Sequence, residues 1–192
     1  EGFKHPIPLV EHEAAAIAAS VQTHPKEMTG RATTSDGLGS ARRAHLSCHA
    51  QAGATVNESA LMVGEEELTL GELVASGERR VPEFVGLSAC GSGGNTFDDL
   101  DQAVGFPSML IALGARSVMA TLWPVGDRDA ATFTTLFYTR WAASGGTIGD
   151  AFTAHVRALQ QQRPLNSTFA AYALFGDPQL RWDNPPDPID LT

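Results

Sequence analysis

The sequence predicts an α/β protein in which helices cover both faces of a mostly parallel sheet. Short apolar runs alternate with longer segments whose apolar residues recur at helical spacing, a rhythm typical of strand–helix–strand units. With 192 residues, 43% of them hydrophobic, the chain is long enough to bury one sizeable core. We therefore expect one domain over residues 1–184 and a flexible, proline-rich tail over 185–192.

The expected elements follow from apolar spacing and from the residues that end each run. Apolar residues three or four positions apart indicate helices, and short branched or aromatic runs between turn residues indicate strands. The expected helices cover residues 9–21, 70–75, 99–113, 127–141 and 147–161, and the expected strands cover 29–33, 44–48, 60–63, 67–70, 84–89 and 116–125.

The ends of several elements carry recognisable signals. Residues 60–63 and 67–70 flank a short turn, which predicts a hairpin at the margin of the sheet. Thr69 and Asp127 are expected to cap the helices that follow them, and Gly114 is expected to end the helix before it.

Two of the expected strands end in reactive side chains. His49 follows the strand at 44–48, and Cys90 follows the strand at 84–89, directly before a glycine-rich turn. The alternation of side chains puts His49 with His45 and Ser47, on the face opposite Cys48, which we expect in the core. Sites in parallel sheets lie at the carboxyl ends of strands, so His49 and Cys90 are expected to meet at one edge.

An imidazole beside a thiol can perform nucleophilic catalysis. The histidine increases the thiolate fraction of the cysteine, which then attacks a carbonyl carbon. The backbone amides of Ala50 and Cys90 are candidate donors to the resulting oxyanion. A lone cysteine or histidine at a strand end is more often part of the packing. The catalytic interpretation therefore depends on the two residues occurring together.

Composition excludes several other classes of function. The chain has 13 Lys and Arg against 22 Asp and Glu, a net charge of −9, and we expect no direct contact with nucleic acid. Two cysteines suit neither a disulfide framework nor a zinc site, so we expect no metal, no cofactor and a reducing, cytoplasmic location. No apolar run is long enough to span a membrane. A phosphate-binding turn at 91–96 is a weaker alternative, because Thr96 stands where a glycine is needed.

Four segments together resemble the CHAT family of caspase-like cysteine peptidases, in the same clan as separases. They are AHLSCHA, VGLSACGSG, GFPSMLIALGARSVMATLWPVGDRDAATF and YALFGDP. The likeness covers residues 8–180 and implies a caspase-type three-layer α/β/α sandwich with a His49 and Cys90 dyad. It also implies an endopeptidase domain at the C-terminus of a larger protein, controlled by another domain or ligand.

The sequence departs from the family pattern in three places. Ala50 stands where many members have glycine, and Pro124 stands where separases have the aspartate that holds a basic substrate residue. Family members also begin with apolar strands upstream of the helix at 9–21. The chain has none there, so we expect an upstream segment or a regulatory domain to complete the sheet.

Substrate binding is expected at the same edge of the sheet. The resemblance implies that an extended peptide pairs with backbone just after residues 121–123. Trp123 either forms one wall of this site or packs in the core. Acidic residues on the neighbouring loop could select a basic substrate side chain. The expected substrate-binding residues are Gly91, Asp98, Asp99, Thr121, Leu122 and Trp123.

The function predicted from the sequence is a cysteine endopeptidase that acts on a protein substrate and is gated by another domain or ligand. His49 would act as general base and then as general acid, and Cys90 as the covalent nucleophile. The alternative is a catalytically silent CHAT-like module that binds partners.

Overall fold

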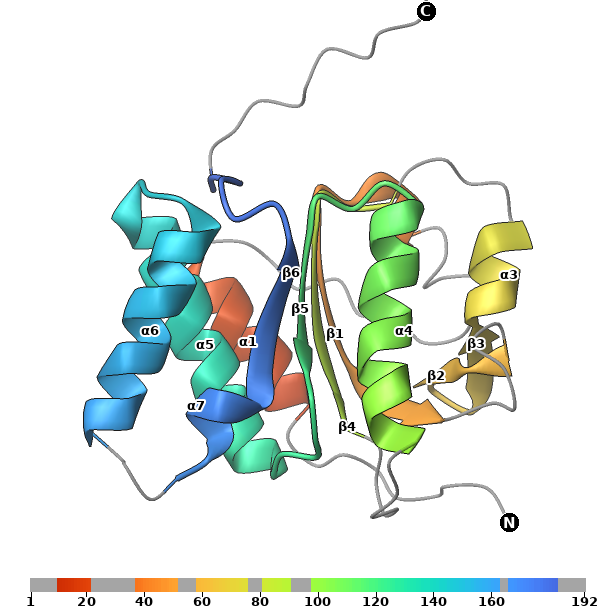
Figure 1. Ribbon diagram of the computed structural model, residues 1–192, viewed down its shortest axis with the longest axis horizontal. Helices are drawn as coiled ribbons and strands as arrows, with labels where there is room; N and C mark the ends of the chain where they lie inside the picture. Colours follow the sequence, from red (N-terminus) through yellow and green to blue (C-terminus); the bar gives the residue numbers. More distant parts are fainter. Residues whose placement is uncertain are drawn as a thin grey trace, which may run out of the picture.

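The computed structural model describes residues 10–21, 37–51, 58–75, 81–90, 98–162 and 166–182. It has a mixed α/β fold with a six-stranded open sheet in the order β3-β2-β1-β4-β5-β6 and helices on both sides of it (Figure 1). The strands are β1 Arg43–Gln51, β2 Ala60–Val63, β3 Glu66–Thr69, β4 Phe84–Cys90, β5 Ser117–Thr121 and β6 Tyr172–Gly176.

The sheet is mixed, which corrects the prediction of a mostly parallel one. The pairs β1–β4 and β4–β5 are parallel, whereas β1–β2, β2–β3 and β5–β6 are antiparallel. The β2–β3 hairpin was predicted, and strands joined by a tight turn must run in opposite directions. Gly64 in that turn has φ +75°, a conformation that favours glycine. The difference comes from the antiparallel β1–β2 and β5–β6 pairs. The three parallel strands form the centre of the sheet.

The apolar spacing predicts each of the helices α1, α3, α4, α5 and α6, whereas the short helix α7 was not predicted. Their bounds are α1 Val10–Ser20, α3 Leu70–Ala75, α4 Asp98–Ala112, α5 Asp127–Ser144, α6 Ile148–Gln162 and α7 Thr168–Ala171. Thr69 caps α3 as expected, since its Oγ1 accepts the Glu72 amide at 3.1 Å and the Glu72 carboxylate accepts the Thr69 amide at 3.0 Å. The cap of α5 is Gly126 and not Asp127, which is the first helical residue.

Two segments of the prediction lie outside the described residues, the strand at 29–33 and the tail at 185–192. Residues 37–40, next to the first of these, form a helical turn. In the part of the chain that the structure describes, no helix is both long enough and apolar enough to cross a membrane.

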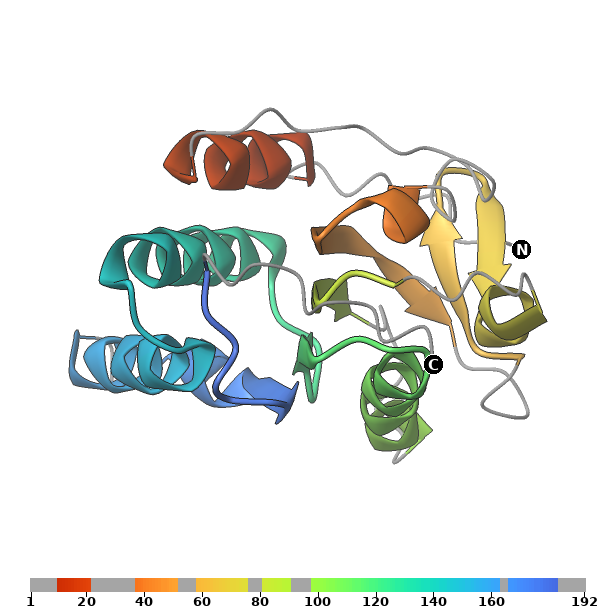
Figure 2. The same cartoon turned by 90° about the horizontal axis from the view of Figure 1, so that it is seen from above.

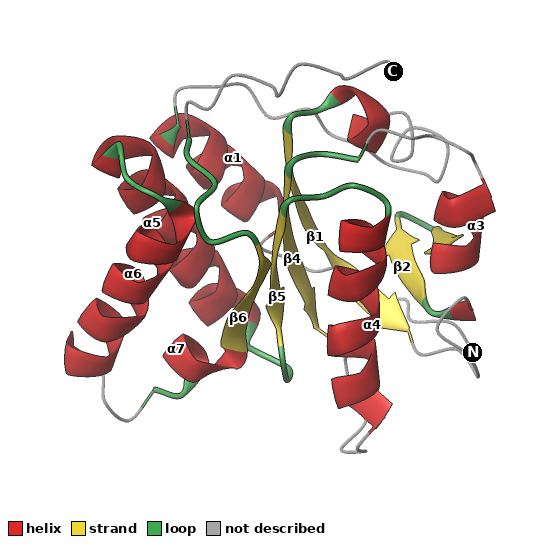
Figure 3. Cartoon of the chain, turned by 45° about the horizontal axis from the view of Figure 1, so that its top comes forward, coloured by secondary structure: helices red, strands yellow, loops and turns green. Residues whose placement is uncertain are grey.

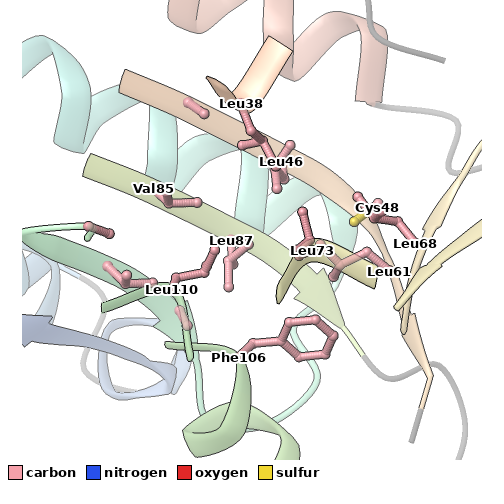
Figure 4. Close-up of a cluster of buried hydrophobic side chains, with 14 of the residues drawn as sticks. Leu38, Leu46, Cys48, Leu61, Leu68, Leu73, Val85, Leu87, Phe106 and Leu110 are labelled. Carbon is pink, nitrogen blue, oxygen red and sulfur yellow. The ribbon is translucent and has the colours of Figure 1, made fainter. Parts of the chain in front are cut away.

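Each face of the sheet has its own core. On one face, apolar side chains of β1 and β4 pack against α3 and α4, with Leu46, Cys48 and Leu87 among them (Figure 4). On the other face, aromatic residues of α5 pack on β4, and the rings of Phe84 and Trp141 are 5.0 Å apart. Helices α1 and α5 lie side by side on this second face, with α6 beyond α5 (Figure 2).

Candidate functional site

The two reactive residues predicted from the sequence lie on neighbouring parallel strands. His49 lies in β1 and Cys90 is the last residue of β4, and the two are direct register partners. Backbones of neighbouring strands are about 4.8 Å apart, so register partners hold the shortest separation that a sheet allows. The structure therefore places the backbones of His49 and Cys90 side by side near the carboxyl ends of β1 and β4. Strand β1 continues two residues beyond His49 to Gln51, so the predicted end of that strand at residue 48 is too early. The two strands are neighbours in the sheet (Figure 3).

The alternation expected along β1 is confirmed. Ala44, Leu46 and Cys48 are buried on the α3 and α4 face, and Cys48 is only 9% exposed. Its sulfur lies among leucine side chains (Figure 4). His49 is half-buried and follows Cys48, so it belongs to the opposite face of the sheet. Cys48 is thus a core residue, and the face of β1 that carries His49 is the one covered by α1 and α5.

The expected oxyanion donors also lie on these two strands. Ala50 is inside β1, where it pairs with Leu61 of β2, and Cys90 ends β4. Residues 91–97, Gly91 among them, lie outside the described residues. Asp98 and Asp99 are the first residues of α4. The assignment of these residues to the oxyanion hole and to substrate binding stays a prediction.

The segment after β5 forms one side of an open cleft. Thr121 is buried and pairs with Tyr172 of β6, and the Leu122 amide donates to the Ala171 carbonyl at 2.7 Å. Trp123 is 40% exposed, which excludes the alternative that it packs in the core. The cleft has a volume of about 400 Å³ and is lined by Trp123, Pro124, Val125, Gly126, Asp129, Asn166, Ser167 and Thr168.

This cleft opens at the end of the sheet that carries the reactive pair. β5 runs parallel to β4, so the residues after Thr121 leave the sheet at the same edge as Cys90. The β4–β5 pairing ends at Leu87 and Ala120, whereas the β1–β4 pairing continues to His49 and Cys90. Strands β1 and β4 therefore stay paired beyond the last β4 residue that pairs with β5.

A buried carboxylate lies beneath the reactive pair and was not predicted. Glu13 of α1 is 5% exposed, and the Thr134 hydroxyl donates to its Oε1 at 2.6 Å. The same Oε1 lies 3.1 Å from His45 Nε2 and accepts the Ser88 hydroxyl at 3.2 Å. The Ser47 hydroxyl donates to Oε2 at 2.5 Å. Five elements of this face, α1, α5, β1, β4 and β6, contribute to this network, because Ser88 also contacts the Tyr172 hydroxyl at 3.1 Å.

Electrostatics keep this carboxylate ionised. Burial opposes the charge and by itself would raise the pKa of Glu13. The hydrogen bond and charge interaction with His45, together with the Ser47 and Thr134 hydroxyls, outweigh burial and lower the pKa to about 2. Burial, followed by the nearby charge of Glu13, raises the pKa of Tyr138 well above its usual value. Tyr138 therefore stays neutral and hydrogen bonds to His45 Nδ1 at 3.2 Å.

A sequence signal for this network exists, although its meaning depends on the fold. His45 and Ser47 are polar residues on a strand face that turns out to be covered by two helices. Polar residues at alternate positions of a central strand indicate either a solvated face or a buried polar network. Which of the two applies depends on whether helices such as α1 and α5 cover that face of the strand. Glu13 lies on α1, and the apolar spacing of α1 predicts an amphipathic helix without indicating a buried carboxylate.

The segment YALFGDP contains β6 and finishes at the end of the sheet opposite His49 and Cys90. β6 is antiparallel to β5, so Gly176 pairs with Ser117 at the beginning of β5. The Asp177 carboxylate accepts Arg116 Nη2 at 2.7 Å, and this hydrogen bond lowers the pKa of Asp177. The Asp177 amide also donates to the Arg116 carbonyl at 2.8 Å. These contacts fasten β6 to the sheet and lie far from His49.

The other histidines in the described part of the chain are not arranged to bind a metal. Among the residues that the structure describes, no group of three or more His, Cys, Asp or Glu side chains is placed to hold an ion. His12 is exposed on α1, and His155 is fully buried against Phe133, with ring centroids 4.5 Å apart. His5 and His24 lie outside the described residues.

Comparisons with known proteins agree with the sequence resemblance. A search of curated proteins with this sequence found no match. Residues 2–178, most of the chain, match the family model described as the CHAT domain. CHAT domains are caspase-like, and the mixed sheet, the helices on both of its faces and the placing of His49 beside Cys90 are compatible with that relationship. The chain therefore belongs to the CHAT domain family.

Proposed function

We propose that this CHAT domain is a cysteine endopeptidase whose catalytic dyad is His49 and Cys90. The observation that carries the proposal is the register of β1 and β4, which makes these two residues direct partners at the carboxyl ends of parallel strands. Membership of a caspase-like family supports the same reaction class.

The proposed reaction is acyl transfer through a thioester. The His49 imidazole takes the Cys90 thiol proton, and the thiolate sulfur attacks the carbonyl carbon of the scissile peptide bond. As the C–N bond breaks, His49 gives the proton to the leaving amine, and the acyl group stays on Cys90. His49 then deprotonates a water molecule that attacks the thioester. The products are a carboxylic acid and the regenerated thiol.

Substrate binding is proposed along the edge between the end of β4 and the segment after β5. An extended peptide there would pair with backbone and place one side chain in the cleft beside Trp123. The Leu122 amide already donates to Ala171, so the peptide would use other backbone groups of this segment. Asp129 is the acidic residue of the cleft, and it supports a preference for substrate side chains that donate hydrogen bonds.

We also propose that a strand from outside the described residues, or from a regulatory domain, completes the sheet. The register of β2 against β1 covers residues 49–51, whereas β4 pairs with β1 from Arg43 to His49. A strand added along the first part of β1 would extend the sheet directly beside His49. Such an addition would let a partner control the dyad.

The test of the dyad is the alkylation of each thiol by iodoacetamide, followed by peptide mass spectrometry. Cys90 is expected to react faster than Cys48 at neutral pH. His49→Ala is expected to slow the alkylation of Cys90 by at least about tenfold, because an unassisted thiol is only a few per cent thiolate at neutral pH. His12→Ala, which removes an exposed histidine on α1, is the matched control and should change nothing. Equal, slow labelling of both thiols in the wild type would overturn the dyad.

Cleavage is tested separately with a peptide library prepared from a denatured proteome. New N-termini are expected with the wild-type chain and not with Cys90→Ala. A chain that cleaves no library peptide, and whose partner binding survives Cys90→Ala, would instead be a silent binding module.

A further inference from the structure

The Glu13 carboxylate joins the two strands that carry the proposed dyad. Ser47 of β1 and Ser88 of β4 are direct register partners, and both donate hydrogen bonds to Glu13, Ser47 to Oε2 and Ser88 to Oε1. The next register pair on this face, two residues further along both strands, is His49 and Cys90. Two residues advance a strand by about 7 Å, so the carboxylate lies one pleat repeat beneath the proposed dyad.

Helices hold the same carboxylate from the other side. Glu13 belongs to α1, and its Oε1 accepts the hydroxyl of Thr134, a buried residue of α5. His45, on the same face of β1 as Ser47, contacts Oε1 through Nε2 and Tyr138 of α5 through Nδ1. The Glu13 side chain of α1 therefore bonds to α5, β1 and β4 at once, next to the strand ends that carry His49 and Cys90.

Stability alone is a poor explanation for a charge at this position. Removing a carboxylate from water costs several kcal/mol, and apolar packing commonly stabilises such a site equally well. A charged side chain with four oxygen or nitrogen partners instead requires one specific arrangement of those partners. On this face of the sheet, the feature that requires a precise relative position of β1 and β4 is the proposed pairing of His49 with Cys90.

We propose that Glu13 is a positioning residue that holds β1 and β4 in the alignment that lets His49 activate Cys90. This role rests on the proposed dyad. Glu13 acts through Ser47 and Ser88 and takes no part in the chemical steps. An error of about 1 Å in the approach of a catalytic pair can reduce a rate by about a hundredfold, so a small shift of either strand is sufficient for a large effect.

The experiment compares Glu13→Gln with the wild-type chain by the rate of iodoacetamide alkylation of Cys90 as a function of pH. Glutamine keeps the size of the side chain but lacks the charge and cannot accept all four contacts. We expect the rate at neutral pH to fall at least about tenfold, and the midpoint of the pH profile to move toward about 8.5, the value of an unassisted cysteine. Loss of stability alone would leave the profile of the folded protein unchanged.

Two further kinds of variant make the result decisive. Ser47→Ala and Ser88→Ala each remove one contact and leave the others, so they report on alignment even if Glu13→Gln does not fold. Each is expected to slow the alkylation of Cys90, but by less than Glu13→Gln does. The effect of each on this rate is expected to be non-additive with the effect of Glu13→Gln. Glu72→Gln is the matched control, because Glu72 stabilises α3 on the opposite face and its loss should leave the Cys90 profile unchanged.

The outcomes separate this inference from the proposed function. If His49→Ala slows Cys90 while folded Glu13→Gln, Ser47→Ala and Ser88→Ala all keep the wild-type rate and profile, Glu13 has no positioning role and the dyad stands. If His49→Ala has no effect on Cys90, the dyad and the positioning role are both overturned.

Discussion

Gly86 shows how closely single atoms are packed around the buried polar network. A Cβ at this position of β4 would lie 2.5 Å from the Tyr138 hydroxyl oxygen and 2.7 Å from His45 Nδ1. Those two atoms are hydrogen bonded to each other at 3.2 Å, and both side chains are held in place by other contacts. The absence of a side chain at residue 86 is therefore what allows His45 to reach Tyr138.

Gly86→Ala is expected to lower the free energy of unfolding by about 1–3 kcal/mol, the usual cost of overpacking a core. The measurement is urea denaturation followed by circular dichroism. Gly146→Ala is the control, because its Cβ would meet only Ser144 at an ordinary 3.5 Å, and we expect a change within about 0.5 kcal/mol. Equal midpoints for Gly86→Ala and the wild type would show that the Tyr138 and His45 contact can be lost at no cost.

At the scale of elements, helix ends are held by short side chains at defined positions. Helix α6 begins after Thr147, whose Oγ1 accepts the Asp150 amide at 3.1 Å and donates to the Asp150 carboxylate at 2.7 Å. Gly145, just before this cap, has φ +60° and ends α5. The connection between α5 and α6 is therefore very short, and α6 packs against α5 through aromatic contacts such as that of Phe152 with Phe133.

Thr147→Ala is expected to lower the free energy of unfolding by about 1 kcal/mol, because the Asp150 amide loses its acceptor at the buried start of α6. Thr153→Ala, which removes an exposed hydroxyl from the same helix, serves as the control and should have little effect. Thermal unfolding of both variants at one pH checks the difference. A larger loss for Thr153→Ala would contradict the assignment of the cap.

At the scale of the whole molecule, two buried ionisable groups make stability depend on pH. Burial, with a smaller contribution from Arg140, lowers the pKa of His155 from 6.5 to about 4. The unfolded chain therefore binds the proton more tightly than the folded one, and stability falls as the pH drops from 6.5 to 4. The pKa of Glu13 is lowered from 4.5 to about 2, so its contribution is lost between pH 4.5 and 2.

We expect each group to account for roughly 3 kcal/mol over its own pH window. His155→Leu should flatten the pH dependence of the unfolding free energy between pH 6.5 and 4 and leave the lower window unchanged. Glu13→Gln should flatten the window between pH 4.5 and 2. Urea titrations at a series of pH values measure both, and a slope between pH 6.5 and 4 that persists in His155→Leu would exclude His155 as its source.

Local signals allowed much of this fold to be predicted from the sequence. The strands that precede His49 and Cys90, the β2–β3 hairpin and the Thr69 cap depend on residues close together in the chain, and the structure confirms all of them. Strand direction was harder to predict, because a strand has the same two-residue period whichever way it runs. Strand β6 was not predicted at all, and its antiparallel direction depends on the contacts of Gly176 and Asp177 with the start of β5.

The sequence by itself determined that this chain belongs to the CHAT family, where strands β1 to β5 lie, and that a histidine and a cysteine stand near the carboxyl ends of two of them. Only the tertiary structure decided that these two residues are register partners, and that Glu13 lies below them between two serines. The physical reason is that a buried carboxylate is stable only where several distant groups bond to it at once. Those groups come together only when α1, α5, β1 and β4 pack in one arrangement.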